Sequence, residues 1–157
     1  MKVLFICTRN SHRSQMAEGL ARAAGAEAFS AGTKPAGFVH SLAVQVMAEI
    51  GIDISAQRSK PFDMSQARDM DAVITVCDDA EERCPVIFGV RRLHWPILDS
   101  LESIGTWDEV LSRFRRVRDN MAWRVNELLK DLRRAQNDER ASDLSDGPWR
   151  DALPISK

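Results

Sequence analysis

The sequence predicts an open α/β sheet, because short apolar segments alternate along it with segments of helical periodicity. Residues 2–6 form an apolar run that is typical of a buried strand, and residues 14–24 follow as a good helix-forming segment. Residues 71–76 form another such run, of the kind found in parallel sheets. Ligands of open α/β sheets bind at the carboxyl ends of the strands, so we expect a site where these two runs end.

The other elements follow in the order of the chain. Residues 27–30 predict a short strand, and residues 42–50 carry apolar side chains at helical spacing. Residues 52–62 are rich in turn-forming residues and predict a loop, and residues 63–69 predict a short helix. From Trp107 onward we expect one long amphipathic helix. Its apolar positions are Val110, Leu111, Phe114, Val117, Met121, Val125, Leu128, Leu129 and Leu132. Arg113, Arg115, Arg116 and Arg118 lie mainly off this apolar stripe, which favours a solvated face over the alternative of a binding patch.

Length and composition predict one domain over residues 1–135, followed by a polar, mobile tail over residues 136–157. The 22 Lys and Arg residues nearly balance the 23 Asp and Glu residues, so the net charge of −1 gives no support for a nucleic-acid or membrane partner. No apolar run approaches the roughly 20 residues that span a bilayer, and no signal peptide precedes the first strand. Three cysteines in such a chain favour reactive thiols in the cytoplasm over a disulfide scaffold. We expect a monomer.

The junction between the first strand and the first helix predicts a reactive anion site. Cys7 follows the strand, and Arg13 lies six residues later. Between them lie Thr8, Arg9, Asn10, Ser11 and His12. The amides of these five residues can converge on one point at the positive end of the helix dipole, where an arginine fork suits a tetrahedral oxyanion.

The same positive field favours the thiolate form of Cys7, and Ser14 can donate its hydroxyl to the sulfur. Cys7 is therefore predicted to be a nucleophile aimed at a bound oxyanion. A buried structural cysteine beside a surface arginine is the alternative interpretation.

The segment 7–19 resembles the phosphate loop of the low-molecular-weight protein tyrosine phosphatase fold, and the likeness covers residues 2–134. It implies a four-stranded parallel open sheet with helices on both faces and a phosphatase-like anion loop after the first strand. Arg9 stands where the family commonly has Gly, and His12 stands where many members have a second Cys. The loop is most similar to the arsenate reductase branch in Asn10-Ser11 and in Arg13-Ser14-Gln15-Met16-Ala17-Glu18-Gly19.

Two further cysteines decide between branches of this family. Cys77 follows directly after the predicted strand 71–76, and Cys84 lies seven residues later in a polar segment. Zinc is a competing interpretation, but two cysteines at this spacing without a matching His pair fit no common zinc site. Two idle thiols are the other alternative. Spacing and context, including Pro85, resemble the redox pair of thioredoxin-coupled arsenate reductases.

The resemblance implies a reaction in which three cysteines carry two electrons. The loop amides and Arg13 would hold arsenate, with phosphate or sulfate as analogues, while Cys7 attacks arsenic. Cys77 would then attack Cys7 and release arsenite, and Cys84 would move the disulfide to the surface for external thioredoxin. We expect no bound cofactor and no metal. The handover requires residues 78–93 to rearrange, because a disulfide needs Cα atoms within roughly 7 Å.

Asp99 matches the family's general acid, which lies on the loop after the last strand and protonates the leaving oxygen. An ordinary surface aspartate is the alternative. His94-Trp95 resembles the reductase version of this loop, and Ser100 replaces the usual Pro. Phosphatases of this fold place aromatic side chains, commonly Tyr, around the mouth of the site, whereas this chain has no Tyr.

The predicted function is therefore thioredoxin-dependent arsenate reduction. The alternative is a phosphatase that hydrolyses small or peptide phosphoesters through a phosphocysteine at Cys7. A non-enzymatic protein that binds oxyanions or senses thiol oxidation is a third possibility.

Some reductase relatives hold a potassium ion near the loop. The residues that do so match Asn10, Glu18 and Ser30 together with an aspartate, and Lys60 stands at the position of that aspartate. The resemblance therefore implies that the Lys60 ammonium substitutes for the ion and that activity is independent of potassium. A solvated lysine without this role is the alternative.

Overall fold

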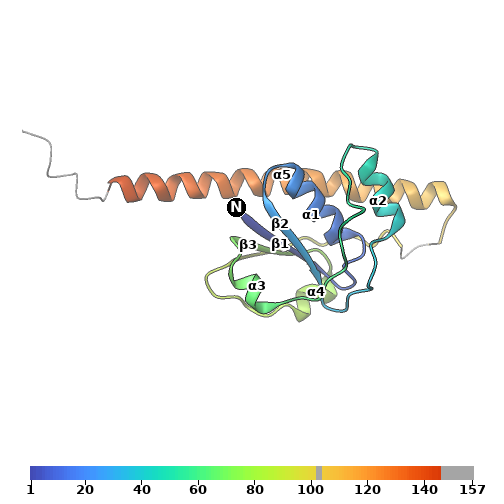
Figure 1. Cartoon of the computed structure of the whole chain (residues 1–157), viewed down its shortest axis with the longest axis horizontal. Coiled ribbons are helices and arrows are strands. Elements are labelled where there is room, and N and C mark those ends of the chain that lie inside the picture. Colours follow the sequence, from blue (N-terminus) through green and yellow to red (C-terminus); the bar gives the residue numbers. More distant parts are fainter. Residues whose placement is uncertain (102–103, 146–157) are drawn as a thin grey trace, which may run out of the picture.

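Four parallel strands form one open sheet in the order β2-β1-β3-β4 (Figure 1). The structure is a computed structural model and describes residues 1–101 and 104–145. Its strands are β1 (Lys2–Cys7), β2 (Glu27–Gly32), β3 (Ala72–Thr75) and β4 (Arg91–His94). β1 and β3 are neighbours, with Ile6 opposite Thr75, so their carboxyl ends lie side by side as the sequence predicts. The expected fold class is confirmed.

Helices cover both faces of this sheet (Figure 1). They are α1 (Arg13–Ala23), α2 (Ser41–Ala48), α3 (Met64–Arg68), α4 (Asp78–Arg83) and α5 (Trp107–Ser145). α1 and α2 pack against α5 on one side, and α3 and α4 lie on the other side. The catalytic candidates on the β1–α1 and β3–α4 loops therefore meet at one edge of the sheet.

The core forms around β1 and the apolar stripe of α5. Val3, Leu4, Phe5 and Ile6 are fully buried, as expected for a central strand covered on both faces. Seven of the nine predicted α5 positions are buried, and the other two pack against the core while partly exposed. Burying a large apolar side chain stabilises the fold by roughly 1.5–3 kcal/mol, so this stripe holds the sheet and the loop after β1 firmly in place.

Two segments differ from the sequence-based expectation. α5 continues to Ser145 instead of giving way to a mobile tail after residue 135, because no Gly or Pro interrupts residues 136–145 and helix propensity outweighs polar composition there. Residues 146–157 of the predicted tail lie outside the described residues, and the domain boundary stays a prediction. The polar segment after Cys77 forms the short helix α4. Its sequence has no apolar stripe, and Ala80 is its only buried residue. Acidic side chains in its first turn favour this helix.

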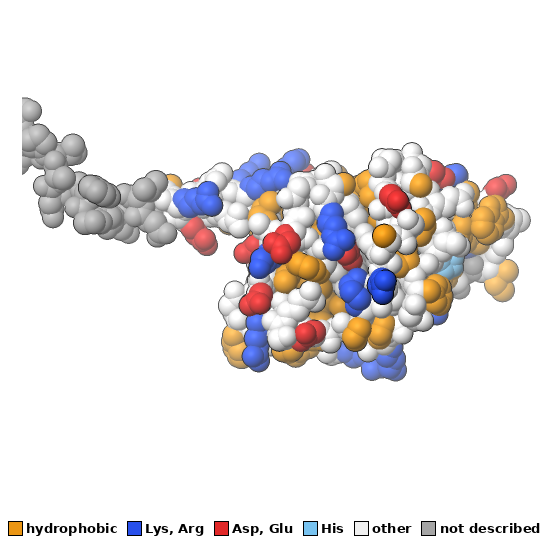
Figure 2. Space-filling model, viewed as in Figure 1, with side chains coloured by type: hydrophobic (Ala, Val, Ile, Leu, Met, Phe, Trp, Pro, Cys, Tyr) orange, Lys and Arg blue, Asp and Glu red, His pale blue; other side chains and the backbone are white. Residues whose placement is uncertain are grey.

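The surface carries interspersed acidic and basic side chains, without one large area of a single sign on the face that Figure 2 shows. This distribution agrees with the nearly balanced composition. Within residues 1–101 and 104–145, no helix is long and apolar enough to cross a membrane.

Candidate active site

Cys7 lies at the end of β1 with two donors directed at its sulfur. The backbone N–H of Asn10 donates to Cys7 Sγ over 3.1 Å, and Ser14 Oγ lies 3.0 Å from the same sulfur. Asn10 Nδ2 donates to Ser14 Oγ over 2.8 Å, which leaves the Ser14 hydroxyl proton free to point at the sulfur. Cys7 is 2% exposed. The Asn10 N–H, the Ser14 hydroxyl and the start of α1 therefore surround the sulfur on the side where an oxyanion would react.

Asn10 shapes the loop around this sulfur. It is fully buried and has a φ of +46°, in the left-handed region that asparagine tolerates better than most residues. Its Nδ2 donates to Ser30 Oγ over 2.8 Å, while its Oδ1 accepts from the Lys60 N–H over 2.8 Å and from Gln15 Nε2 over 3.0 Å. One side chain therefore connects the loop to α1, to β2 and to the segment before α3. Such contacts hold the loop in place before a ligand arrives.

The loop accommodates Arg9 without backbone strain, and Gly32 of β2 lets that strand approach the loop closely. Asn10 is the only non-glycine residue with positive φ among residues 1–101 and 104–145, so Arg9 needs none of the backbone freedom of the glycine it replaces. Arg9 is exposed, and its carbonyl accepts from Ser59 Oγ over 3.1 Å. At Gly32 a Cβ would lie 2.8 Å from the Thr8 carbonyl oxygen, so glycine is required there for the close approach of β2 to the loop.

Arg13 lies at the start of α1 and pairs with the predicted acid. Its Nη2 lies 3.0 Å from Asp99 Oδ2, its Nη1 donates to the Ile97 carbonyl over 3.0 Å, and its Nε is buried without a hydrogen-bond partner. Burial alone would raise the pKa of Asp99, but contacts with His12, the Leu101 amide and Arg13 outweigh it and hold that pKa well below its usual range. Asp99 is therefore ionised in this ligand-free arrangement. An unpaired N–H of Arg13 remains for an incoming oxyanion.

The structure brings Cys77 next to the anion loop. Cys77 is the N-cap residue of α4, and its sulfur lies 3.3 Å from Thr8 Oγ1. Thr8 Oγ1 donates to Asp79 Oδ2 over 2.9 Å, so its lone pairs can accept the Cys77 S–H. Thr8 thus connects the loop that carries Cys7 to the first turn of the helix that carries Cys77.

Cys84 lies at the other end of α4 and is buried, at 6% exposed, rather than on an open polar surface. Burial raises the pKa of the Cys84 thiol, Arg92 opposes this shift, and Glu81 adds to it. The helix places roughly 10 Å of rise between the two cysteine positions, which are seven residues apart. A disulfide between Cys77 and Cys84 therefore requires α4 to unwind.

Polar contacts anchor α4 to the sheet, and the sequence analysis missed most of them. His94 Nδ1 lies 2.9 Å from Thr75 Oγ1, and His94 Nε2 lies 3.0 Å from Asp78 Oδ1. Glu81 pairs with Arg92 over 2.9 Å. Burial would raise the pKa of Glu81, but its contacts with Thr75 and Arg92 lower it overall. The one available signal was an unexplained polar residue, Thr75, in an otherwise apolar strand.

Lys60 is paired rather than simply solvated. Its Nζ lies 3.5 Å from Glu18 Oε2, and Arg22 Nη2 lies 2.6 Å from Glu18 Oε1. Ser30 Oγ donates to the same carboxylate, which is 1% exposed as part of Glu18. Two side-chain cations therefore face this buried carboxylate, and a role of Lys60 in place of an ion stays a prediction.

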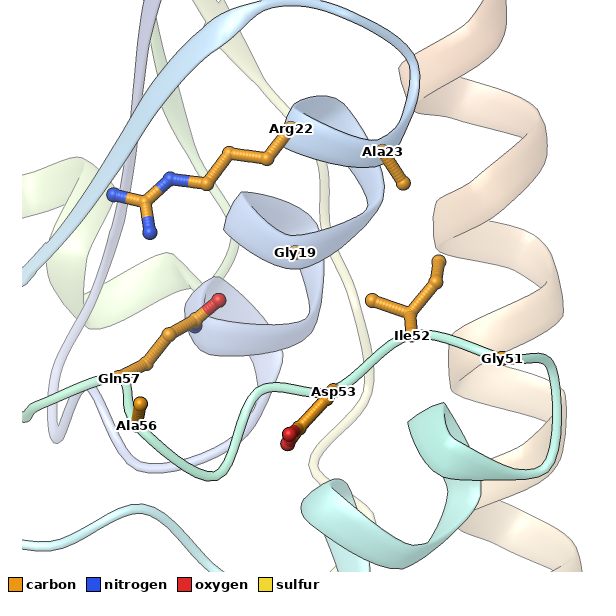
Figure 3. A pocket seen from close by; sticks show the side chains of 8 residues that line it. All are labelled: Gly19, Arg22, Ala23, Gly51, Ile52, Asp53, Ala56 and Gln57. Atoms are coloured by element: carbon orange, nitrogen blue, oxygen red, sulfur yellow. The ribbon is translucent and has the colours of Figure 1, made fainter.

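Two hollows lie outside the loop itself. One runs beside Asp99 toward α5, where Arg113, Arg116 and Arg124 line it. The other, shown in Figure 3, lies between α1 and the segment after α2, with Gly19, Arg22, Asp53 and Gln57 among its lining residues. The second hollow contains none of the predicted site residues, whereas the first is lined by Asp99, which pairs with Arg13 of the loop around Cys7.

A cysteine nucleophile, an arginine and an aspartate around one strand-to-helix loop define a cysteine-dependent enzyme of the phosphatase type. The family model described as low molecular weight phosphotyrosine protein phosphatase matches residues 2–138. The chain belongs to this family.

Several proteins that are similar to this chain are named arsenate reductases. An arsenate reductase of Bacillus subtilis (strain 168) is 42% identical over 130 residues, which cover 80% of this chain and 93% of that protein. A solved thioredoxin-dependent arsenate reductase of Corynebacterium glutamicum superposes with a TM-score of 0.70 at 31% identity, covering 85% of this chain and 62% of that chain. A structure described as an arsenate reductase in the phosphate binding state has a TM-score of 0.63 at 34% identity, over 83% of this chain and 98% of that chain.

Proposed function

We propose that this protein reduces arsenate to arsenite, with Cys7 as nucleophile and Cys77 and Cys84 as the thiols that carry the resulting disulfide away. The observation that carries the proposal is the position of Cys77, whose sulfur lies 3.3 Å from Thr8 Oγ1 in the anion loop. A phosphatase needs no thiol there. Relatives at 42% and 31% identity that are named arsenate reductases support the same reaction.

The first step uses the anion loop as a binding site. Arsenate has the shape and charge of phosphate, so the loop amides and the Arg13 fork can hold it next to Cys7. The Cys7 thiolate attacks arsenic, and a protonated Asp99 supplies the proton with which one arsenate oxygen leaves as water. Ser14 stabilises the sulfur through its hydroxyl, which is 3.0 Å away.

The next two steps move electrons and then the disulfide. The Cys77 thiolate attacks the Cys7 sulfur, the arsenic–sulfur bond breaks with its electron pair on arsenic, and arsenite leaves. Cys84 then attacks Cys77 as a thiolate, which releases Cys7 in its starting form. Because Cys84 is buried and its pKa is raised in the folded helix, unwinding of α4 would both bring it to Cys77 and expose it.

The reducing partner is proposed to be thioredoxin, as the name of the Corynebacterium glutamicum relative states for that protein. A dithiol of this kind would reduce the Cys77–Cys84 disulfide and return the enzyme to its free-thiol form. We further propose that the enzyme acts as a monomer in the cytoplasm, where reduced thioredoxin is maintained, and that it uses no bound cofactor.

Phosphoester hydrolysis is the alternative, because Cys7, Arg13 and Asp99 suffice for it and the family description names a phosphatase. The absence of Tyr weakens this alternative for tyrosine phosphate substrates, which such enzymes grip with aromatic side chains.

The deciding experiment follows NADPH oxidation with arsenate, thioredoxin and thioredoxin reductase, for the wild type, Cys77→Ser and Cys84→Ser. Aryl phosphate hydrolysis is measured for each protein as an internal control of the Cys7 loop. We expect arsenate-dependent oxidation in the wild type only, with equal phosphate hydrolysis, if any, in all three. Robust phosphate hydrolysis without arsenate-dependent oxidation in the wild type would assign the alternative instead.

A further inference from the structure

His12 occupies an unusual position for an ionisable side chain, because it is 2% exposed and lies inside the anion loop. Its Nε2 is 3.1 Å from Asp99 Oδ1, and its Nδ1 is 3.3 Å from Ser11 Oγ. The ring packs against Phe114 at 5.4 Å and His40 at 6.4 Å between ring centroids. The residue thus connects the anion loop to the aspartate that the reaction needs as an acid.

We infer that His12 is a positioning residue that acts through Asp99: it anchors one carboxylate oxygen so that the other faces the leaving oxygen of the bound substrate. This inference rests on the proposed function, because Asp99 serves as an acid only if an oxyanion reacts at Cys7. It assigns to His12 a role beyond that of a backbone amide in the loop.

The two oxygens of Asp99 have different partners in the ligand-free protein. Oδ1 contacts His12 Nε2 at 3.1 Å and accepts from the Leu101 N–H over 2.9 Å, whereas Oδ2 contacts Arg13 Nη2 at 3.0 Å. An incoming oxyanion competes with Asp99 for the Arg13 guanidinium, since both are anions. When Arg13 turns to the substrate, Oδ2 loses its contact with the guanidinium while Oδ1 keeps both of its partners. Oδ2 is then the oxygen that can face the substrate.

In the ligand-free protein His12 Nε2 has no hydrogen-bond partner, and the release of Asp99 by Arg13 can provide one. This Nε2 is buried, and its short contact with Asp99 does not meet the alignment of a hydrogen bond. If the Ser11 hydroxyl donates to Nδ1, the ring proton lies on Nε2 and faces Asp99. A small rotation of the carboxylate, once Arg13 has released it, would align this N–H with Oδ1.

The proton balance is simple. Asp99, which is ionised in the ligand-free protein, takes up a proton from solvent on Oδ2 once Arg13 has turned to the substrate. It then transfers that proton to the As–OH oxygen that leaves, which departs as water. Negative charge develops on the carboxylate as the proton leaves, and His12 stabilises it by donating its Nε2–H to Oδ1 while keeping its own proton. Contacts with His12 are among the causes that lower the pKa of Asp99, which agrees with this direction of stabilisation.

Other charged groups lie around the pair and must be considered in any pH dependence. Arg13 lies at the start of α1, and His40 lies at the N-cap of α2, where burial lowers the pKa of His40 and its proximity to His12 and Arg9 lowers it further. α5 presents the uncharged Phe114 to the ring, and Arg113 on the same helix donates to the Ser100 carbonyl over 3.2 Å.

The test measures one turnover in the enzyme alone, as formation of the Cys7–Cys77 disulfide after mixing with arsenate, across a range of pH. His12→Gln keeps an N–H donor near the position of Nε2, whereas His12→Leu removes it. Phe114→Leu is the matched control, because it disturbs packing around His12 without removing a polar atom. Thermal unfolding verifies that each variant is folded.

We expect His12→Leu to be slower by about 10- to 100-fold, which is less than the roughly 10²- to 10⁴-fold that a general acid contributes, because Asp99 itself remains. His12→Gln should be slower by only a few-fold. The loss of rate at high pH, which reports deprotonation of Asp99, should move to higher pH in His12→Leu and stay in place in Phe114→Leu. The double variant His12→Leu/Asp99→Asn should be no slower than Asp99→Asn. The inference would be overturned if the loss of rate at high pH stayed in place in His12→Leu, or if the losses of rate were fully additive in the double variant. His12 would then contribute to packing only.

A crystal structure with phosphate bound to the wild type separates this inference from the proposed function. If the wild type forms no disulfide with arsenate, the proposed function fails, but the position of Asp99 still decides the role of His12. We expect Arg13 on the phosphate and Asp99 Oδ1 still on His12 Nε2. An Asp99 side chain that has left His12 would overturn the inference.

Discussion

The two sides of this active site are built differently. The loop around Cys7 is buried and connected by side-chain hydrogen bonds to α1, to β2 and to the segment before α3, whereas α4, which separates Cys77 from Cys84, is six residues long and buries only Ala80. Binding and attack on an oxyanion benefit from a loop that is already in place. Transfer of a disulfide between residues seven apart needs a segment that can change shape.

The energies of the contacts support this division. Isolated helices shorter than about 12 residues are marginal in water, so α4 depends on its contacts with Thr8, Thr75, Arg92 and His94. Several of these contacts involve exposed ion pairs, each worth about 0–1 kcal/mol. Local unwinding of α4 is therefore expected at a far lower free energy than opening of the Cys7 loop.

The largest effect should come from Cys7→Ser. In the proposed mechanism Cys7 both attacks the oxyanion and forms the first disulfide with Cys77, so neither step can occur without it. We expect arsenate reduction and any phosphoester hydrolysis to fall together by at least about 10³-fold. Coupled NADPH oxidation and aryl phosphate hydrolysis measure the two activities. If Cys7→Ser retained either activity, the loop would not be the catalytic site.

Cys84→Ser should separate the two sides of the site. The loop and Cys77 remain intact, so we expect one arsenite per enzyme in a single turnover at close to the wild-type rate. Steady-state turnover with thioredoxin should fall by about 100-fold or more, because Cys7 is no longer released from Cys77. Rapid-quench detection of arsenite measures the first quantity. A variant that turns over normally would show that Cys84 is idle.

Asn10→Ala should destabilise the loop around Cys7. The substitution removes hydrogen bonds from several buried partners and leaves an alanine at positive φ, so we expect the free energy of unfolding to fall by about 2–3 kcal/mol. Phosphate binding should weaken in parallel. Urea unfolding measures the stability, with Asn120→Ala on the exposed face of α5 as the matched control, expected within about 0.5 kcal/mol of the wild type. Equal effects of the two variants would contradict a special role for Asn10.

Glu81→Gln should weaken the attachment of α4 to the sheet and so favour its unwinding. Glu81 is one-third exposed, so we expect a loss of less than about 1 kcal/mol in global stability, with a several-fold faster transfer of the disulfide from Cys77 to Cys84. Mass spectrometry of alkylated, quenched samples follows this transfer, and the exposed neighbour Glu82→Gln is the control. A slower transfer in Glu81→Gln would mean that α4 assists the step as a helix.

Acid should have the same effect as Glu81→Gln. The pKa of Glu81 lies below its ordinary value of 4.5, so its ionised contacts stabilise the fold above that pH. This stabilisation is lost as the pH falls from there through the lowered pKa of the folded protein. The pH dependence of stability should therefore be flatter at acid pH in Glu81→Gln than in the wild type.

Potassium should have the smallest effect of all. Lys60 and Arg22 already face the buried Glu18 carboxylate, so replacing sodium chloride by potassium chloride at equal ionic strength should leave arsenate turnover unchanged. Strong stimulation by potassium would refute this prediction. The result would also show that the lysine does not substitute for an ion.

The sequence alone determined the parts of this protein that are contiguous in the chain. A buried strand, a polar loop and a helix follow one another from Lys2 to Ala23, so local periodicity and propensity suffice to place Cys7 and Arg13 at one helix terminus. The apolar stripe of α5 was predictable for the same reason. Composition failed after residue 135, because a polar segment without Gly or Pro can be helical as well as disordered.

Tertiary structure decided what no local pattern contains. Asp99 meets His12, and His94 meets Asp78, across many residues of chain, because the order of the strands brings the loops after β1, β3 and β4 to one edge of the sheet. The burial of Cys84 likewise depends on the docking of α4, whose sequence has no apolar stripe to predict it. Residue types and spacing therefore indicated which side chains are candidates for the chemistry, while packing determined which charges surround each of them and that Cys84 is buried.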